Sequence, residues 1–115
     1  MRAFSKYWLP VLLYALLIFG ISSVPGQELP KTMILPDYLL HFLEYLPFGF
    51  LVCRAIKNTK ESFSAKKIIF FSILLVALYA ASDEFHQMFV PGRFASLSDL
   101  LCDGLGATIG VKVAL

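Results

Sequence analysis

The sequence predicts an all-α integral membrane protein, a four-helix bundle with both termini on the cytoplasmic side of the membrane. Hydrophobic residues make up 58% of the 115 residues and charged residues only 16%, which is more apolar surface than a soluble domain of this length could cover. The length suits a single domain over residues 1–115. Four apolar stretches alternate with polar segments, and the distribution of Lys and Arg gives them an orientation.

The first two spans are expected over residues 7–24 and 37–56. A helix over residues 7–24 reaches about 27 Å, just enough for a hydrocarbon core of about 30 Å. Pro10 falls in its first turn, where proline is tolerated. The run S-S-V-P-G at residues 22–26 ends this helix. A cleaved signal peptide has similar flanks and is the alternative, which would leave three spans.

The third and fourth spans are expected over residues 66–90 and 97–113, separated by a Pro91–Gly92 turn. Basic residues lie at the N-terminus, between the second and third spans, and at Lys112. These segments belong on the cytoplasmic side, so the loops that hold Lys31 and Arg93 face outward. Four spans satisfy this pattern without conflict.

The two cysteines are not expected to form a disulfide. Cys53 lies late in the second span and Cys102 early in the fourth. With the topology above they sit near opposite membrane faces, beyond the roughly 7 Å that separates bridged Cα atoms.

Ionisable residues gather in the outer half of the predicted bundle, where they cost about 2.5–3.5 kcal/mol each on insertion scales and usually mark function. Successive residues of a helix are about 100° apart, and at this spacing most of the ionisable residues fall on one face of each span. These faces carry Asp37, His41 and Glu44 on the second span, Asp83 and His86 with Gln87 on the third, and Asp99 and Asp103 with Gly106 and Gly110 on the fourth. Glu84 falls off to one side of this projection. Because Asp83 and Glu84 are adjacent, only one of them is expected to point fully inward, and the other is expected to reach Arg93 or the turn. A polar network that only holds the helices together is the alternative.

The candidate site divides into two predicted sets. Acid–base groups that could exchange or orient a proton are Glu44, Asp83, Glu84 and His86. Residues expected to bind a ligand are His41, Tyr45, Gln87, Arg93, Asp99 and Asp103, with Arg93 holding a phosphate.

No metal is assigned and no cofactor is indicated. The pairs His41-x-x-Glu44, Asp83-x-x-His86 and Asp99-x-x-x-Asp103 each place two possible ligands one helical turn apart, and such pairs can build a metal centre inside a helix bundle. A network in which Arg93 neutralises the carboxylates is the preferred hypothesis.

Several motifs resemble the VanZ-like family, which is named for a teicoplanin-resistance membrane protein. They are Ser22-Ser23-x-Pro25-Gly26, His41-Phe42-x-Glu44-Tyr45, Ser98-Asp99, Gly106-Ala107 with Gly110, and the more specific run from Asp83-Glu84-x-His86-Gln87 to Pro91-Gly92-Arg93. The resemblance covers most of the chain and implies a multi-pass protein of the bacterial cytoplasmic membrane, with a link to glycopeptide resistance for the named member. Tyr38 and Asp103 depart from the family's usual lysine and asparagine and make this site more acidic.

Three functions remain open at this point. The first is a binder of a lipid-linked or anionic cell-envelope molecule at the outer leaflet, and the second is an enzyme that modifies such a lipid or cell-wall precursor. A small carrier is less favoured, because the ionisable groups stop at mid-membrane. Membrane lipids and a lipid-linked envelope precursor are the expected partners, and the absence of a basic run argues against nucleic acid.

Overall fold

A computed structural model of the chain describes residues 2–24, 37–92 and 97–115. In these ranges the chain forms four helices, α1 (Arg2–Ser22), α2 (Asp37–Thr59), α3 (Ala65–Gln87) and α4 (Leu97–Ala114), and no strand. The predicted all-α fold class is therefore confirmed.

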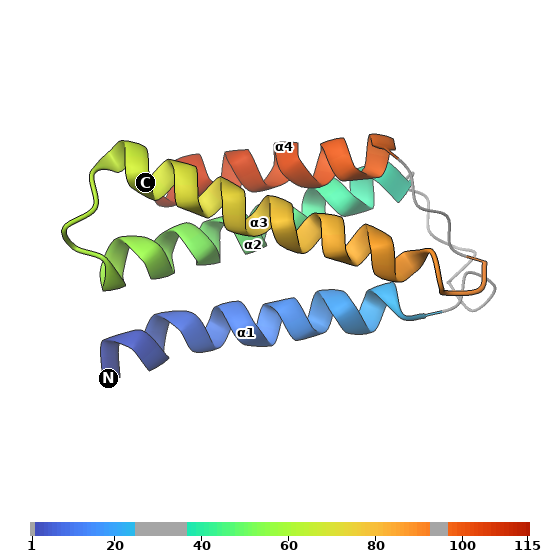
Figure 1. Cartoon of the computed structure of the whole chain (residues 1–115), viewed down its shortest axis with the longest axis horizontal. Helices are drawn as coiled ribbons and strands as arrows, with labels where there is room; N and C mark the ends of the chain where they lie inside the picture. Colours follow the sequence, from blue (N-terminus) through green and yellow to red (C-terminus); the bar gives the residue numbers. More distant parts are fainter. Residues whose placement is uncertain (1, 25–36, 93–96) are drawn as a thin grey trace.

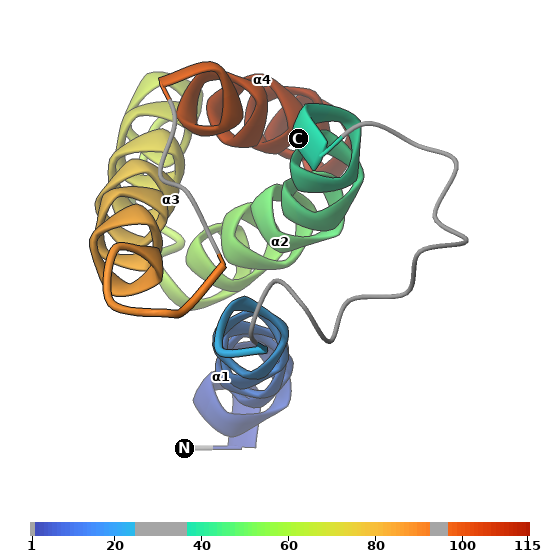
Figure 2. The same ribbon diagram turned by 90° about the vertical axis from the view of Figure 1, so that its right-hand side faces the viewer.

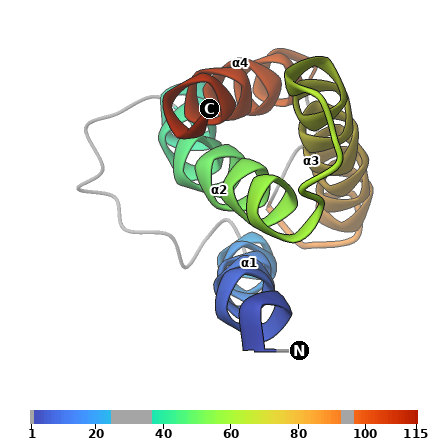
Figure 3. The same ribbon diagram turned by 90° about the vertical axis from the view of Figure 1, so that its left-hand side faces the viewer.

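The four helices lie along one long axis, with both chain termini at the same end (Figure 1). Seen along that axis, α2, α3 and α4 surround a common interior, and α1 packs outside this group against α2 and α3 (Figures 2 and 3). The most extensive helix–helix contact is between α2 and α4. Termini at one end agree with an even number of spans, and the assignment of that end to the cytoplasm stays a prediction from the basic residues.

Three helices, α1, α2 and α3, are long and apolar enough to cross a membrane. α4 falls outside this group because its 18 residues include Asp99, Asp103 and Lys112. Both aspartates are buried inside the bundle, whereas Leu97 and Leu101 on the outer side are 71% and 65% exposed. The exposed face of α4 is therefore mainly apolar despite the composition of the helix.

Several helix boundaries differ from the expected ones, and α2 extends to Thr59 rather than ending at residue 56. α1 begins at Arg2, so Pro10 lies inside the helix and its prediction as a first-turn residue was wrong. α3 ends at Gln87, and residues 88–90 continue it as turns with hydrogen bonds from residue i+3 to residue i. Gly92 then adopts a φ of 73°, a left-handed conformation that favours glycine, and this confirms the predicted turn.

Glycines allow the close contact between α2 and α4. A Cβ atom on Gly110 would stand 2.0 Å from the carbonyl oxygen of Leu46, and one on Gly106 would stand 2.3 Å from that of Phe42. Gly49 of α2 meets the α4 backbone in the same way. The prediction that Gly106 and Gly110 face the bundle is confirmed, and this packing is typical of helices in lipid.

α1 is attached to the other helices by side-chain hydrogen bonds along its length. They run from Trp8 Nε1 to Thr59 Oγ1 at 3.0 Å, from the Tyr14 hydroxyl to the backbone carbonyl of Glu44, and from the Tyr79 hydroxyl to the backbone carbonyl of Ala15. Hydroxyl and indole donors are satisfied in this way inside the apolar bundle.

Candidate functional site

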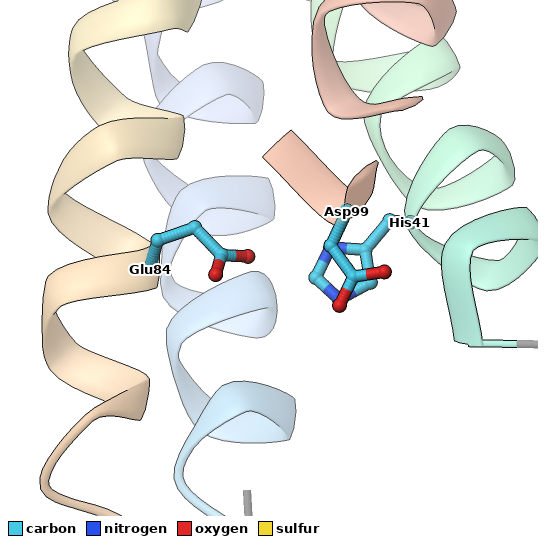
Figure 4. A group of neighbouring side chains, drawn as sticks. All are labelled: His41, Glu84 and Asp99. Carbon is cyan, nitrogen blue, oxygen red and sulfur yellow. The ribbon is translucent and has the colours of Figure 1, made fainter. Parts of the chain in front are cut away.

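A buried polar cluster lies near the end of the bundle that is opposite the termini. His41 comes from the beginning of α2, Glu84 from the last turn of α3 and Asp99 from the first turn of α4. One ligand-type atom of each residue lies within 4.8 Å of the other two. Figure 4 shows the Glu84 carboxylate extending from α3 toward the imidazole of His41 and the carboxylate of Asp99.

The imidazole of His41 lies between two carboxylates of α4. Its Nδ1 is 2.8 Å from Asp103 Oδ1, and its Nε2 is 3.7 Å from Asp99 Oδ2. Residues four apart lie on the same side of a helix, so one face of α4 supplies both carboxylates. With Asp103 ionised, Nδ1–H is the donor in the short contact, which directs Nε2 toward Asp99.

The close packing of α2 and α4 brings these residues together. Phe42, which follows His41, has its carbonyl oxygen against Gly106, one turn beyond Asp103 on α4. A larger residue at Gly106 would force the helices apart and lengthen the His41–Asp103 contact. The glycine stripe therefore positions the cluster as well as the helices.

A second polar contact lies one turn further along α2. The Tyr45 hydroxyl donates to Asp83 Oδ2 at 3.2 Å, and both side chains are buried. Asp83 Oδ1 and Asp103 Oδ2 are buried with no hydrogen-bond partner among the residues that the structure describes. Gln87, one turn after Asp83, is also buried.

Both acidic residues at the end of α3 face the interior, which corrects the expectation that Glu84 lies to one side. Asp83 is 4% exposed and Glu84 is 7% exposed. The two side chains diverge: Asp83 bonds Tyr45 of α2, whereas Glu84 reaches His41 of α2 and Asp99 of α4. Because α2 and α4 both line the interior opposite α3 (Figure 2), each acid finds a different part of that surface.

His86 does not join the cluster, and its assignment to the inward face of α3 was wrong. Its Nε2 lies 2.9 Å from Ser23 Oγ, and its ring stacks on Phe19 with centroids 4.4 Å apart. Ser23 also donates to the Phe19 carbonyl at 2.8 Å, so its hydroxyl accepts from His86. Ser23 was missed as a partner because the Ser-Ser pair indicates a helix end, and nothing in the sequence relates it to α3.

The structure separates the remaining predicted site residues. Glu44 is half-buried on α2, on a turn whose backbone carbonyl accepts from Tyr14 of α1, and it is not part of the His41–Glu84–Asp99 group. The predicted pairs His41–Glu44 and Asp83–His86 are thus each divided between different surroundings. Arg93 lies outside the described residues.

This arrangement suits two kinds of chemistry. An imidazole between carboxylates can take up and release protons, and clustered carboxylate oxygens attract cations or hydrogen-bond donors. Anions need a positive group in addition, because carboxylates in a medium of low dielectric constant repel them.

Comparison with known proteins agrees with the sequence motifs. A model of the VanZ/LLP1 family matches residues 7–115, nearly the whole chain. Searches of curated proteins and of solved structures found no match.

Proposed function

The chain belongs to the VanZ/LLP1 family, and from this membership and the buried polar cluster we propose that it binds the headgroup of an anionic, lipid-linked envelope molecule in the bacterial cytoplasmic membrane. The observation that carries the proposal is the convergence of His41, Glu84 and Asp99 from three helices at one end of the bundle. A purely structural network needs fewer ionisable groups, since each costs about 2.5–3.5 kcal/mol on insertion scales.

The headgroup is recognised through two complementary features. The carboxylates accept hydrogen bonds from its hydroxyl, amide or ammonium groups. Arg93 follows Pro91 by two residues. Its planar guanidinium donates hydrogen bonds to the phosphate of the headgroup. The location of the cluster near one end of the bundle supports recognition of a headgroup rather than of an acyl chain.

Lipid mass spectrometry of detergent-purified protein tests the proposal. Wild type is expected to carry a specific phosphate-bearing lipid that is lost in Arg93→Ala and in Asp99→Asn. Lys60→Ala, in the connection at the opposite end of the bundle, serves as a matched control and retains the lipid. An identical lipid profile in all four proteins would contradict the proposal.

An enzyme that modifies the same class of molecule is the second candidate. It is favoured by the placement of the His41 ring between Asp103 and Asp99, which suits proton transfer. Incubation of the purified protein with the co-purified lipid, followed by mass analysis, separates the two, because only an enzyme changes the mass of the ligand.

We extend the proposal to glycopeptide resistance because of the resemblance to a family that is named for a teicoplanin-resistance protein. Expression of wild type is expected to raise the teicoplanin concentration that a susceptible bacterium tolerates, and Asp99→Asn is expected to abolish the increase. Equal tolerance with wild type and with an empty vector would remove this part of the proposal.

A further inference from the structure

We infer that His41, Glu84 and Asp99 bind one divalent transition-metal ion, with Asp103 orienting the imidazole. The inference rests on the proposed function only for the ligand that completes the coordination of the ion; the metal site itself follows from the geometry of the protein. It departs from the sequence-based preference for neutralisation by Arg93 alone.

The separations of the three ligand atoms suit an ion better than a direct hydrogen bond. His41 Nε2 and Asp99 Oδ2 are 3.7 Å apart, whereas a hydrogen bond would bring them to about 2.7–3.2 Å. Ligands about 2.0–2.2 Å from a tetrahedral zinc ion lie about 3.3–3.6 Å from one another. The two atoms are therefore already almost at the spacing that an ion requires.

Glu84 supplies the third ligand with a small movement. The three atoms lie within 4.8 Å of one another, so the Glu84 carboxylate has to approach by about 1 Å to reach the spacing of bound ligands. Glutamate has three rotatable side-chain bonds, and the Glu84 carboxylate already points at the other two ligands (Figure 4). Rotation of this side chain closes the site without movement of the helices.

Asp103 provides the contact that usually lies behind a metal-bound histidine. Metal-binding histidines commonly donate their other ring nitrogen to a carboxylate, which fixes the ring and increases its basicity. The Asp103 side chain is 0% exposed and lies 2.8 Å from His41 Nδ1, and the other ring nitrogen, Nε2, faces Asp99. The second oxygen of Asp103, like Asp83 Oδ1, is buried without a hydrogen-bond partner in the described part of the chain. A water molecule bound to the ion is a donor that can satisfy such an oxygen.

The ligand set indicates the class of metal. One imidazole nitrogen and two carboxylate oxygens, with no thiolate, suit zinc, manganese or ferrous iron. Three protein ligands leave a fourth position open for water or for an oxygen of a bound molecule. A phosphate oxygen in that position would bring an anionic headgroup into a cluster that otherwise repels it.

Metal binding is tested without lipid, on detergent-purified protein that has been treated with EDTA. Titration with Zn²⁺ or Mn²⁺, followed by calorimetry and elemental analysis, is expected to show about one equivalent bound per chain. His41→Ala and Asp99→Asn are expected to weaken binding more than 100-fold, and Asp103→Asn by about 10–100-fold as a positioning residue. His86→Ala is the matched control, because His86 contacts Ser23, in the turn after α1, and not the cluster, and it is expected to bind as wild type does.

Two results would overturn the inference: metal bound at less than a tenth of an equivalent by wild type, or binding by Asp99→Asn equal to that of wild type. Asp99→Asn keeps the shape of the side chain, and the thermal unfolding of each variant shows whether it is folded. Co²⁺ supplies an independent readout, since its visible absorption is expected in wild type and in His86→Ala but not in Asp99→Asn.

Lipid analysis before and after EDTA separates this inference from the proposed function. Bound metal without a co-purified lipid would refute the proposed function and leave the metal site standing. A lipid that is retained after EDTA treatment and is lost only in Arg93→Ala would refute the metal as its anchor and leave headgroup binding standing.

Discussion

Replacement of Gly110 by alanine should separate α2 from α4. The added Cβ atom would stand 2.0 Å from the Leu46 carbonyl oxygen and 2.8 Å from the Phe50 backbone nitrogen, whereas real Cβ contacts stay above 3.0 Å. Both neighbours are backbone atoms, so side-chain rotation cannot relieve the clash, and the helices must move apart by about 1 Å. Overpacking a well-packed interior lowers the free energy of unfolding by about 1–3 kcal/mol. Because the neighbouring atoms belong to the backbone and cannot rotate away, we expect a loss in the upper part of that range for Gly110→Ala.

Gly104→Ala is the matched control for this prediction. Gly104 lies on the same helix, and nothing stands within 4 Å of its added Cβ atom. Its substitution is expected to leave stability unchanged or to raise it by up to about 1 kcal/mol, the helix-propensity difference between the two residues. Reversible unfolding in mixed micelles measures both variants. Equal stability of the two would refute the conclusion that the α2–α4 contact depends on glycine.

Three further outcomes are expected. Tyr45→Phe removes the hydroxyl that donates to buried Asp83 and should lower the free energy of unfolding by about 1–3 kcal/mol. The double variant with Tyr45→Phe and Asp83→Leu should recover part of this loss in the same micelle assay, because no buried carboxylate is then left without its donor. Lys60→Cys, in a cysteine-free background, should react with a membrane-impermeant maleimide only after the cell is opened; reaction in intact cells would reverse the orientation that the basic residues predict. Cys53 and Cys102 are free, as predicted. Because Cys53 is 0% exposed, it should react with N-ethylmaleimide in folded protein at least ten times more slowly than Cys102 does, as measured by mass spectrometry. Similar rates for the two cysteines would show that α2 is not closely packed at Cys53.

The helices and their inward polar face on α4 could be predicted from sequence, because hydrophobic length and the spacing of Asp99, Asp103, Gly106 and Gly110 are local properties of one helix. The residue that each polar side chain contacts could not be predicted from sequence. Periodicity placed His86 beside Asp83, yet His86 contacts Phe19 of α1 and Ser23, in the turn after α1, instead of the cluster.

Glu84 shows the same limit of helical periodicity, because it is buried although the periodicity placed it to one side. A helical projection treats the interior as one direction, whereas α3 faces both α2 and α4, so two adjacent acids can each be buried. Ligand spacing within α2 and within α3 was therefore a poor guide, since the group that converges takes one residue from each of three helices, His41, Glu84 and Asp99. Such a group is a property of tertiary packing and has no signature in sequence spacing.

The attachment of α1 and the position of the cluster together imply an order of events during synthesis. The bonds from Trp8 and Tyr14 to α2 can form as soon as the first two helices have left the ribosome, whereas the contact between Ser23 and His86 has to wait for α3. His41 meets its two α4 carboxylates only after α4, the last helix in the described part of the chain, has been synthesised. An interrupted chain can thus reach the membrane with much of its apolar surface in place but without the polar cluster, so the site forms only on a chain whose synthesis has been completed through α4.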